Sequence, residues 1–226
     1  PTGKIYFIRS NRVRKYDPYT RSTEVVSLPI SSLAEEVEGI YSLWGDSIEK
    51  LYIVDTSNHL IQTLNLNDPT APLVAVAGNG EDIIPENGAI ATFTGIGFPF
   101  QIWSNLAGHF FFTDYEASNV YEVNEEGRIY KILGTGSYGV SGIGLTSVVT
   151  QIGAPVGIVG DRFGNIYVAA NSGTGVMYKL SDPVAYDYKI EYFAGVPSSY
   201  SLKGSYGHGN GDGSLATSTR FTSIGS

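Results

Sequence analysis

The side chains with the clearest capacity for metal or proton chemistry are three histidines in a chain of 226 residues. His59 follows a turn, His109 precedes a hydrophobic segment, and His208 lies in a glycine-rich stretch. They occupy different positions in different parts of the chain, so nothing in the sequence brings them together. A catalytic zinc or calcium site needs several converging ligands. We therefore expect no catalytic residues, no metal site and no cofactor in this sequence.

Three aspartates could also ligate a cation. Asp55 and Asp114 each follow a short hydrophobic run, where Asp usually accepts hydrogen bonds from the turn that follows. Asp212 lies in a Gly-Asn-Gly-Asp-Gly stretch that lacks the later Glu and the alternating oxygen ligands of a calcium loop. We expect turn roles for Asp55 and Asp114 and a loop without an ion around Asp212. Neither a serine nucleophile elbow nor a phosphate-binding loop is found.

The charge and composition of the chain exclude several classes of partner. The formal net charge is −8, which disfavours binding to nucleic acid or to anionic lipid. A small basic cluster near the start is expected to be a solvated strand face; it comprises Arg9, Arg12, Arg14, Lys15 and Arg21. The longest apolar runs have the length of strands, so no membrane insertion is expected. Cysteine is absent, which excludes disulfides and thiolate metal sites.

A hydrophobic strand pattern recurs four times along the chain. The aromatic second residue of each copy marks the repeat, and the separations are 46, 59 and 56 residues between Tyr6, Tyr52, Phe111 and Tyr167. We expect these four side chains to be buried at equivalent points of one strand type. Each copy is followed by two further strand-like segments with a turn between them, which is expected at Asp182-Pro183 in the last copy. A segment ending in Trp44, Trp103 or Val159 precedes the last three copies, and Gly-Asp motifs at 45–46 and 160–161 predict tight turns after two of these segments.

Each repeat therefore predicts four antiparallel strands, here called A to D. One such sheet cannot cover both of its faces, but sheets stacked radially as propeller blades can. The predicted fold class is all-β, a β-propeller of four-stranded antiparallel blades. It has three full blades and a partial one, and we expect it to be part of a larger ring; the alternative is a small open or four-bladed ring. The expected boundaries are a partial blade at about 1–30, blades at about 37–78, 97–134 and 154–195, and a lead-in to a next blade at 196–226.

Several motifs resemble NHL-repeat propellers, and the resemblance extends over almost the whole chain. The Pro-Val-Gly-Ile entry at 155–158 and the Gly-Asn-Ile-Tyr-Val strand at 164–168 match the first half of that repeat. The segment 55–61, Asp-Thr-Ser-Asn-His-Leu-Ile, matches the second half. Arg9 and Ala170 stand at a position where the family often has Asp. Any role of that Asp therefore cannot apply to every repeat of this chain. The resemblance implies a ring with six blades.

The loops between strand D and the next strand A are long, at about 79–97, 135–154 and 196–225. Loops of this length are usually functional or disordered. They place aromatic residues among Gly and Ser, a composition that adaptable recognition loops use. The candidate ligand-binding residues are Phe93, Tyr138, Tyr200 and Tyr206. An alternative is that these aromatic side chains only pack the loops onto the blades.

Two functions remain open. The first is a non-enzymatic module, secreted or displayed at the cell surface, that binds a protein or a glycan. The second is a lyase or hydrolase whose metal ligands or catalytic residues lie in blades outside this segment. RNA binding, known for some NHL domains, is disfavoured by the negative charge. The unpaired edge and uncovered faces of the end blades predict that further blades or another chain pack against them.

Overall fold

The structure is a computed structural model of the chain. It describes residues 3–10, 12–26, 39–46, 50–68, 70–140, 146–171 and 175–195. Two compact units make up the chain, residues 1–110 with 123–129, and residues 111–122 with 130–226. No helix in the described segments is long and apolar enough to cross a membrane.

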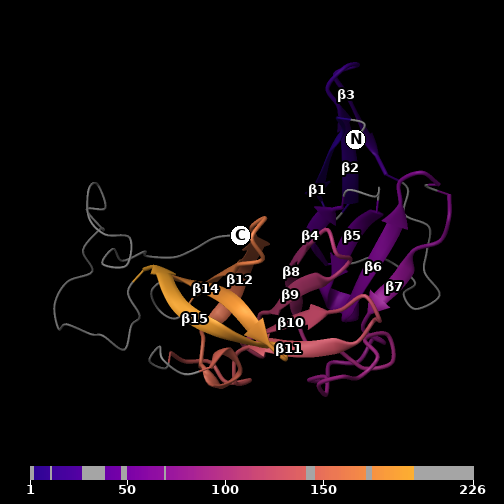
Figure 1. Cartoon of the computed structure of the whole chain (residues 1–226). Coiled ribbons are helices and arrows are strands. Elements are labelled where there is room, and N and C mark those ends of the chain that lie inside the picture. The colour runs from indigo at the N-terminus through magenta and orange to yellow at the C-terminus, as the bar shows by residue number, and fades with distance from the viewer. Residues whose placement is uncertain are drawn as a thin grey trace, which may run out of the picture. The chain divides into compact units, whose positions relative to one another are not determined.

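The described residues form four antiparallel sheets, and the chain passes through the strands of each sheet in sequence order (Figure 1). The first sheet has three strands: β1 (Ile5–Arg9), β2 (Arg12–Asp17) and β3 (Ser22–Val25). The second consists of β4 (Ile40–Gly45), β5 (Lys50–Asp55), β6 (Leu60–Asn65) and β7 (Val74–Ala77). The third consists of β8 (Pro99–Ser104), β9 (Phe110–Asp114), β10 (Asn119–Val123) and β11 (Ile129–Leu133). The fourth consists of β12 (Ala154–Gly160), β13 (Ile166–Asn171), β14 (Gly175–Val184) and β15 (Asp187–Ala194).

The only helical elements among these residues are two single turns of 3₁₀ helix, η1 (Thr56–Asn58) and η2 (Ser147–Val149). Up-and-down sheets of this kind are the blades of a β-propeller. The structure thus confirms the predicted all-β fold class.

Asx turns join the first two strands of each four-stranded sheet, and two of them lie at the Gly-Asp motifs that predict turns. Asp46 accepts a hydrogen bond from the backbone N–H of Lys50 at 2.9 Å. Asn105 and Asp161 do the same for the residues four positions later, each at 3.0 Å. A side-chain oxygen that takes over these backbone donors fixes the register of the strands that follow.

One turn differs from its prediction. Asp182-Pro183 was expected to end strand C of the last repeat, but β14 continues to Val184 through a register shift after Ser181. The turn lies at Ala185 and Tyr186, with φ of +49° and +68°. Two successive positive φ angles are the geometry of tight hairpin turns that match the twist of the strands. Proline is compatible with the irregular edge at such a register shift.

The repeat aromatics lie at equivalent points of the sheets. Tyr6 pairs with Lys15, Tyr52 with Thr63, and Tyr167 with Lys179, in the corresponding strand pairs. The prediction that all four are buried is wrong for two of them. Tyr52 and Phe111 are buried, whereas Tyr6 and Tyr167 are only half-buried. Both half-buried residues belong to the sheets at the two ends of the described chain.

Within the first unit, one hydrophobic cluster holds the first two sheets together. Val13 of β2 is fully buried among residues of the second sheet, and Tyr6, Ile8 and Val26 pack against the same cluster. The second-sheet residues in the cluster are Ile40, Leu51, Ile53, Leu64 and Leu73. Aromatic contacts join the second sheet to β8 and the start of β9, since the Tyr41 and Phe100 rings lie 5.1 Å apart and the Tyr52 and Phe110 rings 5.5 Å apart.

Candidate binding surface on the interblade loops

Each interblade loop begins with a glycine whose backbone only glycine adopts easily. Gly78, Gly134 and Gly195 directly follow β7, β11 and β15, with φ of +88°, +100° and +87°. A Cβ atom at any of them would overlap a backbone carbonyl oxygen at the start of strand C of the same sheet, that of His59, Ser118 or Gly175. The close approach anchors the start of each loop on the turn between strands B and C.

The first loop and the described parts of the second, residues 135–140 and 146–154, are closed in the same way. The N–H of Gly78 donates to the carbonyl of Ala91 at 2.8 Å, and the N–H of Gly134 donates to the carbonyl of Ser147 at 3.2 Å. Both bonds span 13 residues. The residue before each of these acceptors forms an antiparallel bridge with the last strand of the next sheet or the residue before it. The bridges pair Ile90 with Arg128 and Thr146 with Lys189.

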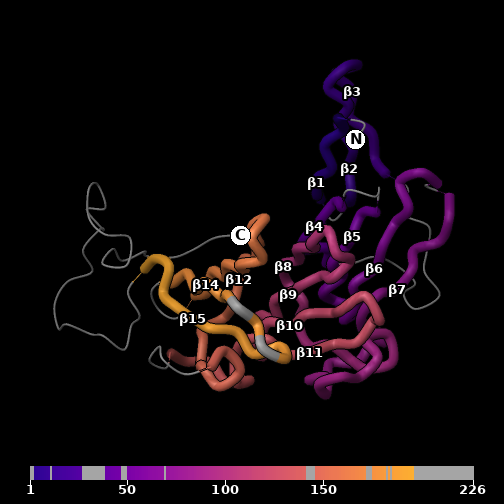
Figure 2. The backbone as a smooth tube through the Cα atoms, viewed as in Figure 1, coloured from indigo at the N-terminus to yellow at the C-terminus, as the bar shows by residue number. Residues whose placement is uncertain are grey.

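Further hydrogen bonds hold the first loop against the turn at residues 124–129. The N–H of Gly88 donates to the carbonyl of Ile129 at 2.7 Å, and the N–H of Ala91 donates to Gly127 at 2.8 Å. The guanidinium of Arg128 donates to the carbonyl of Gly88 at 2.7 Å. Figure 2 shows the path of this loop between β7 and β8. The loop is long, but its backbone is tied down at several points.

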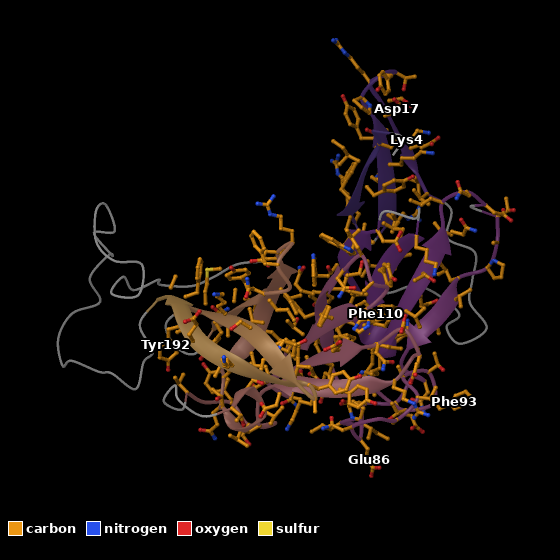
Figure 3. The ribbon with its side chains drawn as sticks, in the orientation of Figure 1. Lys4, Asp17, Glu86, Phe93, Phe110 and Tyr192 are labelled. Carbon is orange, nitrogen blue, oxygen red and sulfur yellow. The ribbon has the colours of Figure 1, made fainter. Side chains whose placement is uncertain are left out.

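This anchored loop displays large apolar side chains to solvent. Phe93 is 82% exposed, and Ile83 and Ile84 are also exposed. Carboxylates accompany them, since Glu81 and Glu86 are exposed on the same loop. Figure 3 shows Phe93 and Glu86 pointing away from the ribbon, whereas Phe110 lies among packed side chains. Phe93 therefore does not pack the loop onto its sheet.

The second loop carries Tyr138, which is 62% exposed. Its neighbour Gly136 donates to the side-chain oxygen of Asn119 at 2.8 Å, and Gly139 donates to the carbonyl of Ile152 at 3.2 Å. The tyrosine thus lies between two backbone anchors. Tyr200 and Tyr206, the other two candidates, lie outside the described residues.

The described polar residues that could have been catalytic have structural contacts instead. His59 Nδ1 lies 2.7 Å from the carbonyl of Gly97 and therefore donates a proton to it, which fixes the end of the first loop. Asp114 accepts from the N–H of Ala117 at 3.0 Å, which is the expected turn role. Asp55 differs, because the side-chain amide of Asn58 donates to both of its oxygens at 3.0 Å.

Both aspartates are completely buried. In the part of the chain that the structure describes, no group of three or more His, Asp or Glu side chains is placed to hold a metal ion. His208 and Asp212 lie outside that part.

Buried tyrosine hydroxyls occupy strand C and strand D of the third and fourth sheets. Burial raises the pKa of Tyr121, Tyr178 and Tyr188 far above the usual tyrosine range. Tyr188 donates to a carboxylate oxygen of Glu122 at 3.0 Å, and this carboxylate raises its pKa further. These hydroxyls stay protonated at neutral pH, and that of Tyr188 acts as a structural donor to Glu122.

Sequence reasoning missed the anchoring glycines. Their signal is present, because a glycine directly follows the last hydrophobic strand residue in Val-Ala-Gly at 76–78, Ile-Leu-Gly at 132–134 and Phe-Ala-Gly at 193–195. The bridge from each loop to the next sheet leaves no such pattern, since Ile90 and Thr146 differ in residue type and in their immediate neighbours.

No protein-family model matches the sequence, and no curated protein matches it either. Solved structures do match. An auxiliary nutrient binding protein from Bacteroides thetaiotaomicron is 22% identical with a TM-score of 0.60, over 84% of this chain and 46% of that one. A chain of a nidogen/laminin complex is 15% identical with a TM-score of 0.57, over 84% and 61%. A streptogramin B lyase is 13% identical with a TM-score of 0.54, over 84% and 51%.

The chain thus spans about half the length of the structures that it matches. At these identities the likeness concerns the fold alone. Together with the four up-and-down antiparallel sheets, it shows that the chain has the β-propeller fold.

Proposed function

We propose that the protein is a non-enzymatic propeller module, of the NHL type that its motifs resemble, and that it binds a protein or a glycan through its interblade loops. The observation that carries the proposal is the 82% exposure of Phe93 on a loop whose backbone is anchored on both sides. A large apolar side chain held in water on a preorganised loop costs little further ordering when a partner covers it.

The comparisons support a binding role by analogy. Two of the similar propellers are described as a nutrient binding protein and as part of a nidogen/laminin complex. Similarity of fold does not by itself show a shared function. The main support for a binding role is therefore the exposed loop residues. We further propose that the protein acts outside the cell or at its surface, the setting in which loop-borne recognition of proteins and glycans is common.

The alternative is an enzyme, since one similar propeller is a streptogramin B lyase. In this alternative the metal ligands or catalytic residues would lie in blades outside this segment. Within the described residues Asp55 and Asp114 are buried and hold turns, and no metal-binding group is formed. Turnover of a streptogramin by the purified protein would favour the alternative over the binding function.

The binding function is tested by screening the purified protein against a glycan array and a displayed peptide library. We expect selective binding that falls at least tenfold in Phe93→Ser and falls measurably in Tyr138→Ser. Leu106→Ser is the matched control, because Leu106 is 91% exposed but lies on a turn between β8 and β9. Binding that survives both loop substitutions would refute the proposed surface.

A further inference from the structure

The outer face of the first sheet, meaning the side turned away from the cluster around Val13, combines apolar and basic side chains. Paired residues of an antiparallel sheet lie on the same face, and neighbours along a strand lie on opposite faces. Arg14 pairs with Phe7 on one side and with Val25 on the other, and Arg9 pairs with Arg12. Ile5 and Val25 on this face are 56% and 44% exposed.

The corresponding face is buried in the other sheets and carries no positive charge there. At the place of the Phe7–Arg14 pair, the second sheet has Ile53 and Gln62 and the fourth has Val168 and Tyr178. All four of these side chains are completely buried. At the place of Arg9, the second sheet has Asp55 and the fourth has Ala170. The first sheet alone has arginine at these points.

The packing of the first two sheets shows how the equivalent face of the second sheet is covered. The side of the first sheet that bears Tyr6, Ile8 and Val13 packs on Leu51, Ile53 and Leu64 of the second. By the repeat, the outer face of the first sheet is the surface on which another sheet would pack. The first sheet and its turns, residues 3–26, hold six basic and two acidic side chains, a net charge of +4, so the rest of the chain has −12.

Burying this face against an ordinary apolar sheet would be unfavourable. An arginine removed from water without a partner costs several kcal/mol. The Nε atom of Arg14 is already buried and has no hydrogen-bond partner among the described residues. A guanidinium is best matched by a carboxylate, which accepts two parallel N–H bonds.

We propose that a further blade of the same propeller covers this face and carries carboxylates that pair with Arg14 and with Arg9 or Arg12. This interface would contain ion pairs, whereas the interface between the first and second sheets is apolar. A second copy of the fourth sheet fits poorly, because its half-exposed face carries Lys179 and Lys189 against a single Glu191. The structures that this chain matches are about twice its length, which is room for such a blade.

The test uses the full-length protein with Arg14→Lys, which keeps the charge but supplies an amine. A carbodiimide joins an amine to a carboxylate only when the two are in contact. Peptide mapping should then find Lys at position 14 coupled to an Asp or Glu of another sheet in the same chain. Lys15, which is paired with Glu24, serves as the internal positive control. Arg162→Lys, on an exposed turn, serves as the solvent control.

A second variant keeps the test decisive if coupling is inefficient. Arg14→Gln should lower the melting temperature and remove most of its decrease with added salt, while Arg162→Gln should change neither. The proposal fails if position 14 couples to a second molecule, couples no more than position 162, or couples only within the first sheet. It also fails if Arg14→Gln leaves the salt dependence intact.

Discussion

At the scale of single residues, the contribution of a buried hydroxyl to stability depends on whether it donates a hydrogen bond. Tyr178 and Tyr188 are both buried in the fourth sheet. The hydroxyl of Tyr188 donates to Glu122, whereas that of Tyr178 has no partner among the described residues. In the second sheet the same position holds Gln62, which reaches Asp55 at 3.4 Å. Ala170 stands at the place of that Asp, so the carboxylate is missing beside Tyr178.

This difference predicts opposite effects for two identical substitutions. Tyr188→Phe should reduce the free energy of unfolding by about 1.5 to 3 kcal/mol, because a buried carboxylate loses a donor. Tyr178→Phe should be neutral or slightly stabilising, because it removes an unpaired polar atom from the interior. Urea unfolding of the two variants measures both values. Equal losses would show that the Tyr178 hydroxyl has a partner after all.

The buried tyrosines also predict loss of stability in alkali. Tyr121, Tyr178 and Tyr188 have pKa values raised by burial, so in the folded protein they ionise at higher pH than in the unfolded chain. The free energy of unfolding is unaffected by these groups below about pH 10. It falls as pH rises above that value, by roughly 1.4 kcal/mol per pH unit for each tyrosine. Urea unfolding at pH values from about 8 to about 11 should show this slope, and Tyr178→Phe should reduce it by about a third. A flat profile would contradict the burial of these groups.

At the scale of elements, the anchoring glycines decide where each interblade loop starts. Gly108, on the turn before β9, also has a positive φ of +85°, but a Cβ there would meet nothing within 4 Å. Substitutions at the two kinds of glycine therefore distinguish the cost of the backbone conformation from the cost of close packing. Conformation alone costs roughly 1–2 kcal/mol for a residue with a Cβ.

Gly108→Ala should therefore cost roughly 1–2 kcal/mol of unfolding free energy. Gly78→Ala and Gly134→Ala should cost clearly more, because the new methyl group overlaps the carbonyl of His59 or Ser118. Gly78→Ala should also weaken any binding that depends on Phe93, since it displaces the loop. Thermal and urea unfolding of the three variants provide the comparison. Equal costs would mean that the loops are not anchored at these glycines.

The strands and turns could be predicted from sequence because they depend on local chemistry. Hydrophobic runs around Tyr52 and Phe111 and Asx turns such as that of Asp161 are readable in a few residues. The C-terminal end of β14 was missed, because a register shift after Ser181 depends on the partner strand. The exposure of Phe93 and the half-burial of Tyr6 also depend on which sheet lies beside them, and no local pattern encodes that.

At the scale of the whole molecule, the end sheets differ from the others in the burial of their faces. Ile5 and Val25 on the first sheet and Phe193 on the fourth are exposed, whereas Leu51 and Ile53, on the face of the second sheet that corresponds to the outer face of the first, are buried. We predict that the 226-residue chain by itself does not form a stable monodisperse monomer and instead associates or unfolds readily. Light scattering combined with thermal unfolding measures this. A monodisperse monomer that unfolds cooperatively would contradict it.

The proposed function requires that a partner binds at the interblade loops. Hydrogen exchange of the protein with and without the ligand selected in the array or library tests it most directly. Ordered loops that become covered by a partner exchange more slowly. We predict that added ligand protects residues 79–95 and 135–140 and leaves the turn at 105–109 unchanged. Protection confined to other segments, with both loops exchanging as in the free protein, would contradict the account.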